Sequence, residues 1–201
     1  MVSVKNDRKS RLEEWRIFCA IEIPLLTRQR VLQHITTLRT LVPEVRASWG
    51  REVNIHLTLK FLGEIPKDLV TNFEVAISRA VSEVGHFPVL IADAGVFPQR
   101  RDPRVLWIGI TDKKGQLSNL HSRLETECER EGFPRDTRPF NPHLTLARLR
   151  NREGAREIAR IHEELSFPSE EITVTEVVLI RSELSSKGSN YTTISKHRLK
   201  N

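Results

Sequence analysis

The 201-residue sequence has little of what marks several classes of protein. It contains only two cysteines, Cys19 and Cys128, which lie too far apart to form a C-x-x-C motif or a zinc site. Each stands in an apolar pattern, which predicts two buried free thiols in a reducing compartment. The nine glycines are scattered and form neither a G-x-G-x-x-G motif nor a P-loop, so nothing indicates a bound nucleotide cofactor.

Long apolar runs are also missing, because none approaches the roughly 18 residues of a membrane span. The first 11 residues are polar and basic with no apolar core after them, unlike a secretory signal. We therefore expect a cytoplasmic protein, with residues 1–12 as a flexible basic tail and residues 13–201 as a single domain. The segment His162-Glu163-Glu164 begins like a metalloprotease signature but lacks the second histidine. We expect neither a metal nor a cofactor.

What is present is an excess of positive charge. The chain has 32 Lys and Arg against 26 Asp and Glu, which gives a formal charge of +6 and a pI near 9.7. This balance favours polyanionic partners such as nucleic acid. A soluble protein with a somewhat basic surface explains the charge equally well.

The apolar spacing predicts strands and helices that are interspersed without a regular β-α-β alternation, which favours the α+β class. Short β-branched or alternating runs predict strands at 15–23, 54–62, 88–96, 105–111, 143–148, 172–180 and 191–195, with a polar loop at 185–190. Helical spacing covers 31–41, 68–84, 116–131 and 155–165. Gly63 is expected to end its strand and Gly85 to cap its helix.

One short pattern occurs twice. Residues 54–61 (Asn-Ile-His-Leu-Thr-Leu-Lys-Phe) and 141–148 (Asn-Pro-His-Leu-Thr-Leu-Ala-Arg) match at five positions, and their histidines lie 87 residues apart. This interval is too long for a solenoid repeat and suits two similar lobes. On a strand, successive side chains point to opposite faces, so the leucines face the core while each histidine shares the other face with its threonine.

Two such faces across one cleft would suit phosphodiester hydrolysis. Of His56 and His143, the neutral imidazole takes a proton from water and the protonated one gives a proton to the leaving oxygen. The hydroxyls of Thr58 and Thr145 can donate hydrogen bonds to the phosphate oxygens where charge builds up. The other five histidines are unrepeated, and we interpret them as structural or surface residues.

At these residues the sequence resembles the two-histidine phosphoesterases, and within them the RNA 2′,3′-cyclic phosphodiesterases, also called 2′-5′ RNA ligases. Beyond the tandem His-x-Thr motif, the resemblance is carried by segments 17–24, 95–98, 104–109 and 179–184. It implies two pseudo-symmetric lobes, each an antiparallel sheet with helices on its outer face, around a basic central cleft. It also implies metal-independent opening of an RNA 2′,3′-cyclic phosphate to a 2′-phosphate, with reversible 2′-5′ ligation as a related activity.

The resemblance assigns roles to six residues. His56 and His143 would be the acid–base pair, Thr58 and Thr145 would bind the phosphate, Phe61 would stack on the terminal base, and Arg148 would contact the phosphate. Phe61 and Arg148 each follow their histidine by five positions, and this odd spacing aims them away from the cleft. A bulge or a strong twist in each strand would turn them back; otherwise they are core and edge residues.

The sequence leaves several questions open. It does not say which histidine is the base. The expected partner is RNA with a 2′,3′-cyclic phosphate end, such as a tRNA half, bound by a monomer. Two alternatives keep the enzyme but change the substrate, to a small cyclic nucleotide or a 2′,5′-linked oligoadenylate. A third alternative is an RNA-binding module without catalysis.

Overall fold

The computed structural model describes residues 13–186 and 188–201, which form four α-helices and a nine-stranded sheet, an α+β fold as predicted. The tail predicted at residues 1–12 lies outside the described residues. The elements in chain order are β1 (Glu14–Glu22), α1 (Leu25–Leu41), β2 (Ala47–Trp49), η1 (Glu52–Asn54), β3 (His56–Pro66), η2 (Lys67–Leu69), α2 (Val70–Val81), β4 (Phe87–Phe97), β5 (Val105–Thr111), α3 (Gln116–Arg130), β6 (His143–Leu149), α4 (Ala155–Leu165), β7 (Glu170–Val174), β8 (Glu176–Ser185) and β9 (Gly188–Arg198).

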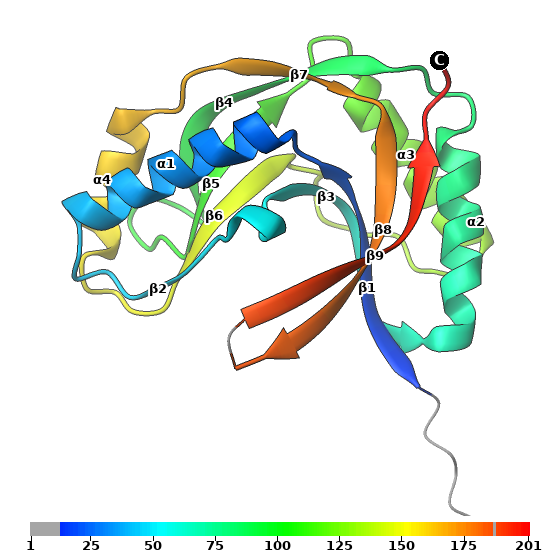
Figure 1. The fold of residues 1–201 in the computed structure, drawn as a ribbon, viewed down its shortest axis with the longest axis horizontal. Coiled ribbons are helices and arrows are strands. Elements are labelled where there is room, and N and C mark those ends of the chain that lie inside the picture. The colour runs from blue at the N-terminus through cyan, green and yellow to red at the C-terminus, as the bar shows by residue number, and fades with distance from the viewer. Residues whose placement is uncertain (1–12, 187) are drawn as a thin grey trace, which may run out of the picture.

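The sheet has the strand order β7-β4-β5-β6-β3-β1-β8-β9, with β2 added alongside β6. Its two central strands, β3 and β6, are joined through a single residue pair, Leu57 with Leu144. The sheet is therefore narrow at its middle and divides into two antiparallel halves, the two lobes that the repeat predicts. Figure 1 shows the halves diverging from this centre.

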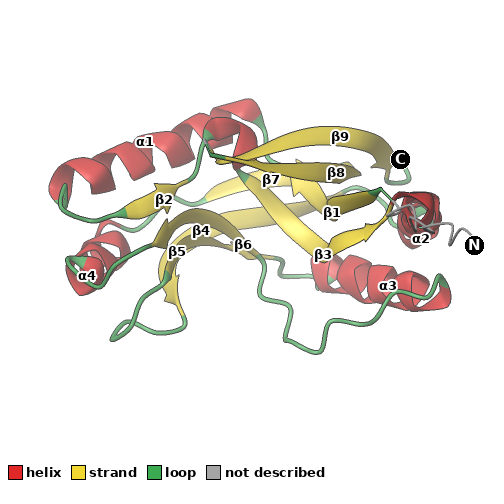
Figure 2. Cartoon of the chain, turned by 90° about the horizontal axis from the view of Figure 1, so that it is seen from below, coloured by secondary structure: helices red, strands yellow, loops and turns green. Residues whose placement is uncertain are grey.

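The helices cover each half from outside. Helices α2 and α3 pack on each other and against β3, β8 and β9, whereas α1 and α4 pack on each other and α4 lies against β4. The two pairs stand at opposite ends of the sheet in Figure 2. Helix α1 follows β1 along the chain yet packs in the other lobe, and α3 likewise crosses over after β5. Each lobe is thus built from both halves of the sequence.

A large apolar core runs through both lobes, and a small separate cluster is formed by Phe18, Ala20, Val178 and Ile180. In α1, the predicted face buries Val31, Ile35 and Leu38, but Leu41 at its end is 54% exposed. Cys19 and Cys128 are both buried and free, which confirms the prediction made from their apolar surroundings. In the part of the chain that the structure describes, no helix is long and apolar enough to cross a membrane.

Several predicted boundaries are wrong for tertiary reasons. Strand β3 continues past Gly63, whose φ of +75° fits an irregularity in the pairing with β1. The strand predicted at 172–180 is interrupted at Thr175, because the chain leaves β4 at one edge of the sheet and pairs with β1 and β9 in the other lobe. Helix α2 ends at Val81, and Gly85 forms a bridge with Lys200 instead of a cap. The short strand β2 was not predicted.

Candidate active site

The two histidines of the repeated pattern begin the two central strands. His56 is the first residue of β3 and His143 the first of β6. The pair between Leu57 and Leu144, each 1% exposed or less, places the floor of the site between them. Because the strands are antiparallel, each histidine lies next to the threonine of the other copy.

A cleft of about 640 Å³ opens above this junction. All six residues singled out from the sequence line it: His56, Thr58, Phe61, His143, Thr145 and Arg148. The structure therefore brings the two copies of the pattern to one site. The cleft is closed on its other sides by β1, by the segment between β2 and β3, and by the tip of the β8–β9 hairpin.

Both imidazoles are held by the carbonyl of the asparagine two positions earlier. The Nδ1 atom of His143 lies 2.7 Å from the main-chain oxygen of Asn141. Because a carbonyl only accepts, Nδ1 carries the hydrogen and Nε2 is left for a substrate. The main chain of Asn54 also accepts a hydrogen bond from the ring of His56. The side-chain amides of the two asparagines bond elsewhere: Nδ2 of Asn54 donates to the main-chain oxygen of Ser189, and Nδ2 of Asn141 donates to that of Pro139.

The site keeps both imidazoles neutral in the free protein at neutral pH. Burial lowers the pKa of His56 to about 4; the bond to Asn54 opposes this shift and the nearby His143 adds to it. Burial also lowers the pKa of His143, and the positive charge of Arg148 lowers it further, against the bond to Asn141. The two rings are thus close enough for one to oppose protonation of the other.

Aromatic side chains supply much of this burial. The ring of Phe18 is stacked on His56 with centroids 4.8 Å apart, and Tyr191 meets the same imidazole edge-on at 5.5 Å. On the other side of the cleft, Phe97 lies edge-on to His143 at 5.1 Å. These contacts limit the positions that each imidazole can adopt.

The question left by the odd spacing is settled by two equivalent bulges. Ala20 of β1 pairs with Thr58 of β3, and Cys19 pairs with Lys60. Leu59 therefore has no partner on β1 and is the extra residue of the bulge. Along β5 and β6, the pairing skips Leu146 in the same way. Each bulge follows its histidine by three positions and reverses the alternation beyond it. The bulge expectation is confirmed: Phe61, 47% exposed, and Arg148 both line the cleft.

The cleft is lined by positive charge. Among the described residues that line it, four are arginines (Arg16, Arg51, Arg148 and Arg150) and none is Asp or Glu. The guanidinium of Arg16 lies over the ring of Phe61 at 4.6 Å. Arg51 donates to the main-chain oxygen of Ser189 in the hairpin, and Arg150 donates to Ser48 Oγ at 2.9 Å. Such a surface favours an anionic ligand.

Sequence reasoning missed most of these surrounding residues. Arg150 lies one residue past the end of β6, so the strand alternation gave no signal for it. Arg16 and Tyr191 had no such signal, because their strands reach the cleft only through the topology of the sheet. Within residues 13–186 and 188–201, no three His, Cys, Asp or Glu side chains are grouped so that they could hold a metal ion.

Comparison with known proteins agrees with this geometry. The model of the 2′-5′ RNA ligase superfamily matches residues 27–185. This chain belongs to that superfamily. A relative from Methanothermobacter thermautotrophicus, named RNA 2′,3′-cyclic phosphodiesterase, is 31% identical over 92% of this chain and 98% of its own. A relative of the same name from Escherichia coli K12 is 33% identical over 68% of this chain and 73% of its own.

Two solved structures share the fold of this chain. The chain resembles E. coli LigT complexed with 3′-AMP, with a TM-score of 0.72 and 27% identity over 94% of this chain and all of that one. It also resembles a protein of Thermus thermophilus, TT0787, with a TM-score of 0.74 and 26% identity over 92% of this chain and 97% of that one. The superfamily architecture therefore extends over nearly the whole chain.

Proposed function

We propose that this protein is an RNA 2′,3′-cyclic phosphodiesterase, which opens a terminal 2′,3′-cyclic phosphate to leave a 2′-phosphate and a free 3′-hydroxyl. The observation that carries the proposal is the meeting of both His-x-Thr copies in one cleft that is lined by four arginines and no described carboxylate. The names of the relatives support the same activity.

The chemistry needs one proton taken and one given. Water attacks the phosphorus, one imidazole removes its proton, and the bond between phosphorus and O3′ breaks as the other imidazole protonates O3′. The hydroxyls of Thr58 and Thr145 donate to the non-bridging oxygens, and the guanidinium of Arg148 balances their charge. An RNA 5′-hydroxyl in place of water would give a 2′-5′ linkage by the same steps, which is the reversible ligation.

The rest of the substrate would extend from the phosphate along the cleft. Phe61 offers an aromatic face for the terminal base, and Arg16, stacked on it, keeps that ring in place. The proposal includes metal independence, action as a monomer, and cytoplasmic RNA such as tRNA halves as the substrate. The two buried free thiols fit a reducing compartment.

The test uses a short RNA with a 2′,3′-cyclic phosphate end, assayed in EDTA with separation of the 2′- and 3′-phosphate products. We expect the 2′-phosphate, and we expect His56→Ala or His143→Ala to lower turnover by about 10²–10⁴-fold. His86→Ala, an exposed histidine outside the cleft, serves as the control. Full turnover in either cleft variant would refute the assignment of the acid–base pair.

The size of the substrate needs a separate comparison. The rate on a cyclic mononucleotide is measured beside the rate on the oligonucleotide. A strong preference for the oligonucleotide supports RNA ends, whereas equal rates favour a small cyclic nucleotide. RNA binding that survives both histidine changes, without any product, would favour a binding module instead.

A further inference from the structure

A buried ion pair lies behind the cleft, on the opposite face of β3 from His56 and Thr58. The Nζ atom of Lys60 is 2.9 Å from Oε1 and 2.8 Å from Oε2 of Glu125, which stands on α3. The two side chains are only 4% and 5% exposed. A lysine at this position would face the cleft on a regular strand; the bulge at Leu59 turns it into the core.

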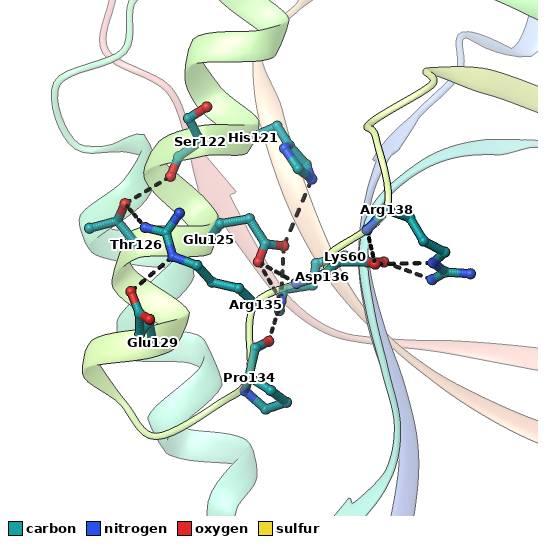
Figure 3. A network of polar contacts seen from close by, with 10 residues as sticks. All are labelled: Lys60, His121, Ser122, Glu125, Thr126, Glu129, Pro134, Arg135, Asp136 and Arg138. Atoms are coloured by element: carbon teal, nitrogen blue, oxygen red, sulfur yellow. Dashed lines mark hydrogen bonds and ion pairs between the residues drawn. The ribbon is translucent and has the colours of Figure 1, made fainter.

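The pair also binds the main chain of the segment that leads to β6. Lys60 Nζ donates to the carbonyl oxygen of Pro134 at 2.9 Å, and Glu125 Oε2 accepts from the N–H of Asp136 at 3.0 Å. Figure 3 shows both contacts converging on the pair from the same segment. Because this segment has no helix or strand of its own, these bonds replace the regular pairing that would otherwise fix it.

A third anchor holds the end of the same segment. The imidazole of His121, one turn before Glu125 on α3, is stacked on the ring of Phe140 with centroids 3.9 Å apart and planes within 8°. Phe140 directly precedes Asn141, whose carbonyl holds Nδ1 of His143. The face of α3 thus contacts the segment that leads to His143. Lys60, directly after the bulge at Leu59, ties this part of β3 to the same helix.

We propose that Lys60 and Glu125 are positioning residues, which set the orientation of His143 and Phe61 without touching the substrate. This inference rests on the proposed function for its kinetic consequence. Strands β3 and β6 are joined directly by one pairing, that of Leu57 with Leu144. The ion pair is a second connection between them, and it helps to keep their relative position fixed.

Stability alone does not explain a charged pair at this place. Replacing a buried ion pair by apolar side chains of similar size is often neutral or stabilising. The second copy of the pattern has Ala147 at the position equivalent to Lys60, and this alanine is fully buried. The repeated motif therefore folds without a lysine there. What an apolar pair lacks is the donor and acceptor for Pro134 and Asp136.

The experiment separates positioning from stability by means of a double variant, Lys60→Met with Glu125→Leu. We expect each single change to lower Tm, because it leaves one charge buried alone, and the double variant to recover Tm. We expect kcat of the double variant to stay about 10- to 100-fold below wild type on the cyclic-phosphate RNA, because small displacements of a catalytic group have effects of this size. Arg130→Gln, at an arginine of α3 whose side chain is 65% exposed, is the matched control and should leave both unchanged.

A spectroscopic readout completes the test. The ring nitrogen signals of His143 should shift in the double variant, because Asn141 no longer holds Nδ1. Those of His34 on α1, in the lobe that does not contain the ion pair, should not shift. Recovery of Tm together with wild-type kcat and unchanged His143 signals would overturn the proposal. If the double variant does not fold, Glu125→Asp keeps the charge balance of the pair but shortens the side chain by one methylene, which withdraws the acceptor from the N–H of Asp136. It should lower kcat and shift His143, and no change in either would overturn the proposal.

Failure of the proposed function can be told apart from failure of the positioning proposal. If the wild-type protein opens no cyclic phosphate, the proposed function fails. The His143 signals of the double variant still show whether Lys60 and Glu125 position that ring.

Discussion

The lowered pKa values of the two histidines predict an unusual pH dependence. Because kcat/KM reports the free enzyme, it follows the fraction of molecules in which the pair holds one proton. The pKa of His56 is about 4, and that of His143 is below its ordinary value of 6.5, both chiefly through burial. Above the pKa of His143, this fraction falls tenfold for each pH unit. Fewer than about one molecule in eleven carries the proton at pH 7.5, and fewer than about one in a hundred at pH 8.5.

The assay is kcat/KM on a 2′,3′-cyclic-phosphate oligonucleotide between pH 5 and pH 8.5, at constant ionic strength and at concentrations well below KM. We expect an optimum on the acid side of pH 6.5 and a basic limb with a slope of −1. Circular dichroism at each pH shows that the protein stays folded. A value of kcat/KM that is constant or rises between pH 6.5 and pH 8.5 would refute the reasoning, because a pair in its neutral form would then be the active one.

Three further changes test the surroundings of the site. Phe61→Ala should raise KM for the oligonucleotide about 5- to 150-fold, the equivalent of roughly 1–3 kcal/mol of base stacking, with little change in kcat, and an unchanged KM would exclude Phe61 from binding. Arg148→Met should lower kcat/KM roughly 10- to 150-fold, because a charged hydrogen bond to the phosphate is lost. It should also move the basic limb of the pH profile to higher pH, because the charge of Arg148 lowers the pKa of His143. A basic limb that stays in place would contradict this effect of Arg148 on His143. Burial and nearby His162 lower the pKa of His34 to about 4. As the pH falls below 6.5, the unfolded state therefore binds a proton at this residue before the folded state does. The free energy of unfolding decreases by up to about 3 kcal/mol by pH 4. Urea unfolding at pH 7 and pH 4.5 should show this acid-induced loss in wild type and a smaller one in His34→Leu, and equal losses would contradict it.

The sequence predicts best where local pattern and tertiary pairing agree. Strand β5 and helix α4 have the predicted bounds, because each has a clear apolar period between strong stop signals. Repetition indicates four of the cleft residues: five positions match on two strands, and the strand period places each histidine beside its threonine. Phe61 and Arg148 differ between the copies and were expected only from the family resemblance.

The sequence fails where another part of the chain decides. Nothing local to Gly63 shows that β1 pairs with β3 beyond it, so the strand was expected to end there. The bulges at Leu59 and Leu146 depend equally on the neighbouring strands, and for this reason the direction of Phe61 could be stated only as a condition. The crossing of α1 and α3 between the lobes leaves no trace in their own spacing.

Buried polar contacts between distant segments were the other failure. His34 and His162 were interpreted as structural or surface residues, and they are structural: they meet across α1 and α4 with ring nitrogens 2.9 Å apart, a contact that the sequence does not indicate. Regular strand alternation would place Lys60 on the cleft face, yet it is buried against Glu125 on α3. Each such pair joins residues more than 60 positions apart, so neither partner carries a local signal.

The central claim is that two imidazoles from distant segments act on one phosphorus atom. The most direct measurement is a crystal structure with a 2′-phosphorylated ribonucleotide, the proposed product, in the cleft. The account predicts a single phosphate with Nε2 of His56 and Nε2 of His143 both within hydrogen-bonding distance, on opposite sides of it. A phosphate bound by the arginines alone, with either imidazole out of reach, would contradict the account.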